Sequence, residues 1–64
     1  MESFTPDLKR ALLRGGCTFV RAGKGDHEVW LSPLTQVLFV VDGKIKSRHT
    51  ANAVLKQAGL PKQF

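Results

Sequence analysis

Three short apolar segments joined by tight turns constrain the fold of this chain more than any other feature. The segments cover residues 17–20, 27–31 and 37–41. Between them, residues 23–26 and 32–35 contain the glycine, aspartate, serine and proline that turns favour. A parallel connection needs a dozen or more residues, so links this short predict an antiparallel sheet whose strands pair in sequence order.

An amphipathic helix is expected on each side of this sheet in the sequence. Residues 5–14 and 48–58 each place apolar side chains on one face at helical spacing. Glycines follow both segments, and Ser47 precedes the second as its expected N-cap. Because two helices can cover one face of a three-stranded sheet, we predict an α+β fold. Residues 1–64 are expected to form it as a single domain, a two-layer α-β-β-β-α sandwich.

The chain is strongly basic. Ten Lys and Arg residues against five Asp and Glu residues give a net charge of +5 and a pI near 10.0. This excess favours a polyanionic partner, most simply nucleic acid, although an evenly solvated surface would give the same total. No apolar run approaches the roughly 20 residues of a membrane span, and no signal peptide opens the chain. With its single cysteine, which cannot form an internal disulfide, the chain is expected to be cytoplasmic.

The sequence Gly-Lys-Gly-Asp-His at residues 23–27 is the strongest candidate for a functional site. A histidine can donate or accept a proton near neutral pH, which suits His27 for acid–base chemistry. Gly23 and Gly25 allow backbone N–H groups to approach an anion closely, and Lys24 adds positive charge. The same residues also describe an ordinary hairpin turn that ends in a histidine. The pattern alone leaves both interpretations open.

A second group of candidate residues leads into the second helix. Lys44, Lys46 and Arg48 are placed to contact phosphates, because the free N–H groups of a helix N-terminus also attract anions. A solvated basic loop is the alternative. His49 would join this phosphate clamp, act as a second acid or base, or be a surface residue.

Alternation along the second strand separates its side chains onto two faces. His27, Val29 and Leu31 share one face, and Glu28 and Trp30 share the other. We expect Val29 and Leu31 to face the helices, with His27 at the rim of that layer. Trp30 would then lie exposed on the free face, where it would stack on a base or contact a partner protein, unless a bulge turns it into the core.

No metal site is expected. Cys17, His27 and His49 lack the close-pair spacing of zinc ligands. Cys17 is interpreted as a core residue rather than a nucleophile, because a reactive thiol needs a basic and accessible setting.

Several short motifs occur in an order typical of one family. They are the double glycine at 15–16, a strand ending in Arg21, the Gly-Asp-His sequence at 25–27 and Val-Leu-Lys-Gln-Ala-Gly-Leu at 54–60. Over residues 7–60 the chain resembles the HicA family, the small bacterial toxins of HicA–HicB toxin–antitoxin systems. That resemblance implies a fold like the double-stranded RNA-binding domain.

The resemblance also implies endoribonuclease activity on mRNA. The family uses a histidine in a Gly-Ser-His motif, which corresponds here to Gly25, Asp26 and His27, with Asp26 in place of the usual serine. Many members carry a Pro-x-His element after the third strand. This chain has Val-Asp-Gly at 41–43, so no second histidine is implied. Asp26 and Glu28 are candidate helpers that would orient the imidazole or favour its charged form.

These observations predict the toxin of a type II toxin–antitoxin system. It would be a metal-independent endoribonuclease that needs no cofactor, cleaves mRNA with His27 as general acid or base, and is restrained by a HicB-like antitoxin. The residues expected to bind RNA phosphates are Lys24, Gly25, Lys44, Lys46 and Arg48. A non-catalytic nucleic-acid-binding module of the same fold is the alternative, and a protein-interaction domain is a third interpretation.

Overall fold

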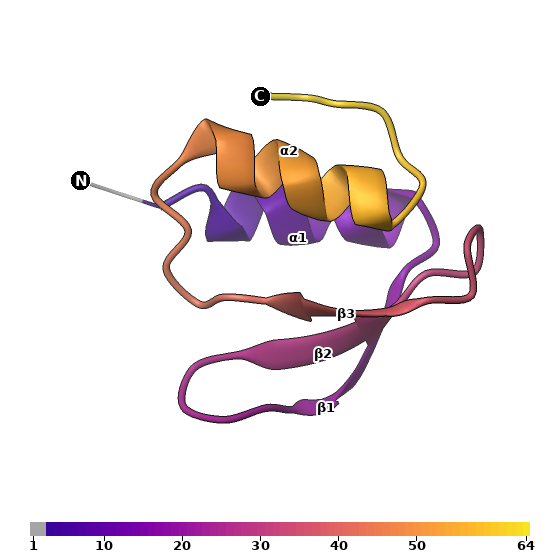
Figure 1. The fold of residues 1–64 in the computed structure, drawn as a ribbon, viewed down its shortest axis with the longest axis horizontal. Helices are drawn as coiled ribbons and strands as arrows, with labels where there is room; N and C mark the ends of the chain where they lie inside the picture. Colours follow the sequence, from indigo (N-terminus) through magenta and orange to yellow (C-terminus); the bar gives the residue numbers. More distant parts are fainter. Residues whose placement is uncertain (1–2) are drawn as a thin grey trace.

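Two helices cover one face of a three-stranded sheet in the computed structural model, which describes residues 3–64 (Figure 1). The elements in chain order are α1 (Thr5–Arg14), β1 (Thr18–Ala22), β2 (Glu28–Leu31), β3 (Leu38–Val41) and α2 (Arg48–Gln57). The strands pair antiparallel in the order β1-β2-β3. The predicted α-β-β-β-α sandwich, which has the element order of the double-stranded RNA-binding domain, is confirmed.

Both helices end at the glycines that the sequence indicates. Gly16 follows α1 with φ +88°, and Gly59 follows α2 with φ +78°, a conformation that glycine adopts readily. Ser47 caps the start of α2, where its Oγ accepts the Thr50 N–H at 3.4 Å. Each helix has 10 residues, and no helix within residues 3–64 is long and apolar enough to cross a membrane.

The core lies between the two layers. It is formed by the inward faces of both helices, by one face of the sheet and by the segments beside them. Its buried residues are Leu8, Ala11, Leu12, Cys17, Trp30, Phe39, Val41, Ile45, Ala51, Val54, Leu55 and Ala58. Cys17 is 1% exposed, which confirms its interpretation as a core residue.

The expected orientation of β2 is wrong. Trp30 is only 4% exposed and packs opposite Phe39 in the core, whereas Leu31 is exposed. The two faces alternate as predicted, but the inner face is the one that carries Glu28 and Trp30. Val29 is also only 8% exposed, although it lies outside the core cluster and lines a hollow on the outer face. Burying an indole removes more apolar surface from water than burying a leucine, and the Glu28 carboxylate accepts the indole N–H at 2.9 Å. His27 therefore belongs with the outer face of the sheet.

The loop between β3 and α2 is fastened to the start of α1. The buried Thr5 hydroxyl donates to the Asp42 carbonyl and accepts the Ile45 N–H, each at 3.0 Å. The Phe4 N–H donates to the Ile45 carbonyl at 2.7 Å. This fixed loop lies at the same end of the molecule as the β1–β2 turn (Figure 1).

The contacts of Glu28 predict a pH-dependent contribution to stability. Hydrogen bonds from Trp30 and from Lys9, at 2.9 and 3.1 Å, lower the Glu28 pKa below its ordinary value of 4.5, and the Lys9 charge adds to this. Because the folded pKa lies below the unfolded one, the stabilisation is complete above the unfolded pKa and is lost as pH falls through the folded pKa.

We predict that Glu28→Gln lowers the free energy of unfolding at pH 7 by about 1 kcal/mol, or the melting temperature by roughly 4–8 °C. The gap from the wild type should close in melting curves taken at progressively lower pH, below the ordinary glutamate value. Asp7→Asn, which removes an exposed carboxylate that pairs with Arg10 in the same helix, is the control and should show a smaller gap. A gap independent of pH would mean that packing, and not the charge of Glu28, stabilises this side of the sheet.

Candidate functional site

A short turn between β1 and β2 holds His27 at the edge of the sheet. The Gly23 N–H donates to the His27 carbonyl at 2.7 Å, and the His27 N–H donates to the Lys24 carbonyl at 3.2 Å. Gly25 has φ +66°, which side-chain-bearing residues rarely adopt. The hydrogen bonds close the turn at its base, and the side chains of Lys24, Asp26 and His27 remain exposed.

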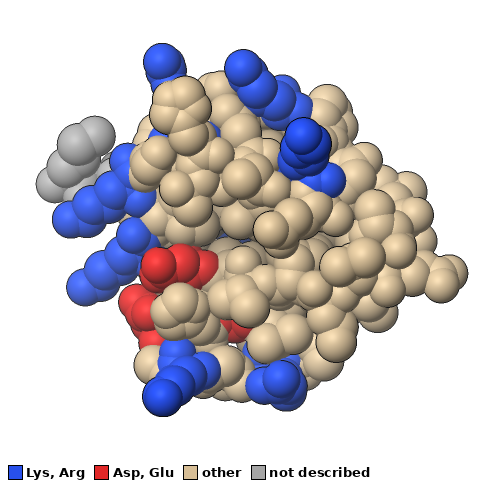
Figure 2. Space-filling model, viewed as in Figure 1, with Lys and Arg blue, Asp and Glu red and all other residues tan. Residues whose placement is uncertain are grey.

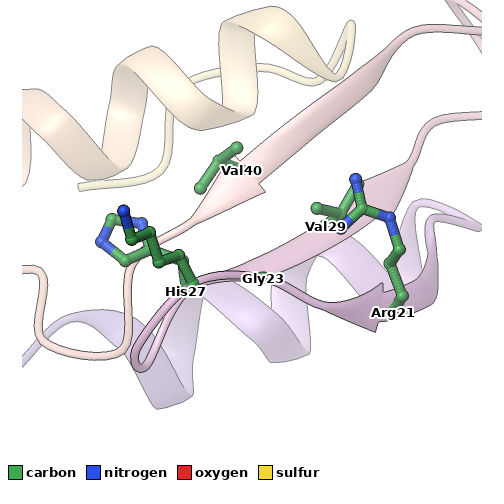
Figure 3. A pocket seen from close by; sticks show the side chains of 6 residues that line it. Arg21, Gly23, His27, Val29 and Val40 are labelled. Carbon is green, nitrogen blue, oxygen red and sulfur yellow. The ribbon is translucent and has the colours of Figure 1, made fainter.

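A shallow hollow of about 390 Å³ lies beside His27 on the outer face of the sheet. Its lining combines cationic side chains with apolar ones. Figure 3 shows His27 at one end and Arg21 with Val29 at the other. The lining residues are Arg21, Gly23, Lys24, His27, Val29 and Val40. Cations around an apolar floor suit a phosphate ester whose sugar or base rests on the valines.

Arg21 is a candidate binding residue that the sequence analysis missed. Phe19 pairs with Trp30, but Arg21 pairs with Val29, so the register shifts and Val20 is the extra residue of a β-bulge. Strict alternation would place Arg21 on the same face as Phe19, toward the helices. The bulge turns Arg21 to the outer face instead, where it lines the hollow. A bulge depends on strand pairing, so the alternation pattern could not reveal it.

The β3–α2 loop meets the β1–β2 turn beside His27. A Cβ atom placed on Gly43 would lie 2.8 Å from Asp26 Oδ2 and 2.9 Å from Asp26 Cβ, so only glycine permits this approach. As a result, side-chain ligand atoms of Asp26, His27 and Asp42 lie within 4.8 Å of one another. Two carboxylates and an imidazole are ligands that a divalent cation can bind. The two carboxylates are equally suited to hold the histidine ring by accepting its N–H groups.

The predicted phosphate clamp begins next to this cluster. Lys44, Lys46 and Arg48 are exposed, and the Lys44 N–H donates to Asp42 Oδ1 at 3.0 Å. Because Gly43 contacts Asp26, the basic segment starts immediately beside the His27 turn. Figure 2 shows acidic atoms at this edge of the molecule, with basic side chains extending above and below them.

The three candidate helpers lie in different surroundings. Asp26 is close to the imidazole. Glu28 lies on the inner face, where its two carboxylate oxygens accept from Lys9 and Trp30, so these contacts do not direct it to His27. His49 is exposed in the first turn of α2 and does not line the hollow.

Comparison with known proteins gives one match. The family model described as the HicA toxin of bacterial toxin-antitoxin matches residues 5–60, from the start of α1 to just beyond α2. No curated protein and no solved structure matches the chain.

The contact between Gly43 and Asp26 predicts that a methyl group added at position 43 destabilises the fold. Gly43→Ala should push the β3–α2 loop away from Asp26 and lower the free energy of unfolding by about 1 kcal/mol, the low end of the cost of overpacking, because the exposed Asp26 side chain can give way in part. Chemical unfolding measures this loss, and the amide NMR shifts of residues 24–27 should move with it.

Asp26→Gly in the same chain removes every Asp26 atom that the new methyl group would meet. The double variant should therefore recover part of the loss, which a double-mutant cycle would show as coupling between the two sites. Additive effects would contradict the close approach of the two loops.

Proposed function

The chain belongs to the HicA toxin family of bacterial toxin–antitoxin systems, and on this premise we propose that it is an endoribonuclease that cleaves mRNA. The observation that carries the proposal is the position of His27 in a hollow that also contains Arg21 and Lys24. A proton-transferring group beside the cation Lys24, with a second cation, Arg21, at the other end of the hollow, suits the cleavage of a phosphodiester. The proposed site of action is the cytoplasm, within a type II system.

His27 supplies the proton transfer in this proposal. In RNA cleavage the 2′-oxygen attacks the adjacent phosphorus, a base removes the 2′ proton, and the leaving 5′-oxygen takes up a proton. His27 performs one of these transfers, and the open hollow allows solvent to perform the other. Lys24 stabilises the negative charge that develops on the reacting phosphate, and Arg21, at the other end of the hollow, binds a neighbouring phosphate. These residues perform the reaction without a bound metal or a cofactor.

RNA binding extends from the hollow along the phosphate clamp. A phosphate can approach the backbone at Gly25 closely, because nothing lies within 4 Å of the Cβ position there. Lys44, Lys46 and Arg48 then bind successive phosphates of the same strand. This surface also fits the alternative function, a nucleic-acid-binding module that does not cleave, and the two proposals differ only in what His27 does.

The first prediction of the proposal separates these functions. His27→Ala should reduce cleavage of a labelled mRNA transcript by about 10²–10⁴-fold, the usual contribution of general acid–base catalysis, and leave RNA affinity and melting temperature unchanged. Wild-type cleavage should persist in a chelator. Cleavage by the folded variant at the wild-type rate would exclude His27 as the catalytic residue.

The second prediction of the proposal concerns RNA binding by the phosphate clamp. Replacing Lys44, Lys46 and Arg48 by alanine should reduce the salt dependence of RNA binding, with a loss of roughly 0.7 in the log–log slope for each phosphate contact to single-stranded RNA. Fluorescence anisotropy across a salt series measures this slope. Lys62→Ala, which removes a positive charge beyond α2, is the control. An unchanged slope would place the phosphates elsewhere.

The proposed protein partner is a HicB-like antitoxin that covers the outer face of the sheet. Leu31, Leu38 and Val40 are 37%, 59% and 51% exposed on this face, and Val29 pairs with Val40 at the floor of the hollow. An apolar surface of this kind marks a protein contact. An antitoxin lying on it would also cover His27 and would match Lys24 with carboxylates.

Leu38→Asp should therefore weaken antitoxin binding at least tenfold, or about 1.4 kcal/mol. The matched control is Leu13→Asp, because Leu13 is also 59% exposed but lies on α1. Calorimetric titration of each variant with the antitoxin measures the two dissociation constants to be compared. Equal losses, or none, would mean that the antitoxin binds another face.

A further inference from the structure

Asp42 faces His27 from a different part of the chain. His27 comes from the β1–β2 turn and Asp42 from the end of β3, yet their side-chain ligand atoms, together with those of Asp26, lie within 4.8 Å of one another. We propose that Asp42 positions the His27 imidazole for proton transfer, an inference that rests on the endoribonuclease activity proposed above.

Asp42 is held in place at two points. Its carbonyl accepts the hydroxyl of Thr5, which is 4% exposed, and its Oδ1 accepts the Lys44 N–H, both at 3.0 Å. The residue is half-buried, whereas Asp26 and His27 are exposed. Within residues 3–64 no hydrogen bond engages Asp42 Oδ2, which leaves this oxygen to accept an N–H from the imidazole.

Asp26 is less suited to the same role. Its carboxylate lies at the tip of an exposed turn, and Oδ2 lies against Gly43, where a Cβ would be only 2.8 Å away. No side-chain hydrogen bond within residues 3–64 fixes its orientation. Asp26 therefore acts mainly as the contact between the two loops, and Asp42 provides the fixed carboxylate.

A fixed carboxylate beside a histidine prepares the ring for proton transfer. By accepting one ring N–H, it selects the tautomer and orients the other nitrogen toward the substrate. No hydrogen bond among the described residues joins His27 to Asp42, but the exposed imidazole can rotate in the RNA-free protein and bring one ring N–H to Asp42 Oδ2.

Asp42→Asn tests the proposal with little change in shape, because the asparagine carbonyl still accepts the Lys44 N–H. With a labelled mRNA transcript as substrate, we expect kcat to fall about 10²-fold, the effect of a misplaced reacting group, and KM to stay unchanged. Asp26→Asn should change kcat only a few-fold. Equal losses in the two variants would overturn the proposal.

A spectrum of the RNA-free protein provides a readout that does not depend on cleavage. Long-range ¹H–¹⁵N correlations report the tautomer of each histidine ring. In the wild type His27 should favour one tautomer, and in Asp42→Asn this preference should be lost or reversed, because the amide N–H that replaces Oδ2 donates instead of accepting; the exposed His49 is the internal control. An unchanged His27 pattern in the variant would refute the pairing even if cleavage falls.

Two further outcomes separate this inference from its alternatives, and a second variant is available if the first does not fold. If the wild type does not cleave RNA but the His27 tautomer depends on Asp42, the pairing stands and the proposed function fails. If cleavage stops in a chelator and returns with Mn²⁺, and Asp42→Asn needs a higher Mn²⁺ concentration than the wild type, Asp42 is a metal ligand and the positioning role is excluded. Asp42→Ser, which also accepts a backbone N–H, replaces the asparagine variant if that variant does not fold.

Discussion

The contact between Gly43 and Asp26 joins the two loops on which the proposed site depends. On one side, hydrogen bonds that join Thr5 and Phe4 to Asp42 and Ile45 fasten the β3–α2 loop to the start of α1. On the other side, two backbone hydrogen bonds close the turn that carries His27. Because a methyl group at Gly43 would overlap Asp26, the loops can meet only with glycine at this position. Their meeting places the clamp beside the histidine.

The helices and the order of the strands could be predicted from the sequence, because both follow from local patterns. Helical spacing of apolar residues and the terminal glycines of α1 and α2 depend on neighbours within one turn. The face of the sheet that meets the helices could not be predicted in the same way. A strand period of two defines two faces of β2, and Val29 and Leu31 made either one plausible as the core. Burial of Trp30, with its N–H bonded to Glu28, decides between them.

The residues of the candidate site fall into the same two groups, those that the local sequence predicts and those that depend on tertiary packing. His27 and Lys24 stand in one contiguous motif and could be selected by their chemistry alone. Arg21 and Asp42 could not. A bulge turns Arg21 into the hollow, and packing of the β3–α2 loop places Asp42 beside the imidazole, so both depend on contacts between segments distant in the sequence. Local patterns thus identify the reactive group, and tertiary contacts supply its surroundings.

The central claim is that the chain cleaves RNA by attack of the 2′-oxygen, with His27 performing one of the two proton transfers, and the chemistry of the cleaved ends tests this attack most directly. Attack by the 2′-oxygen leaves a 2′,3′-cyclic phosphate, or the 3′-phosphate formed when that ring opens, and a 5′-hydroxyl. Mass spectrometry of the fragments from a cleaved transcript should find these ends, and a transcript with 2′-deoxy substitutions at the cleavage sites should remain intact there. Fragments with 3′-hydroxyl and 5′-phosphate ends, or cleavage at a 2′-deoxy position, would contradict the account.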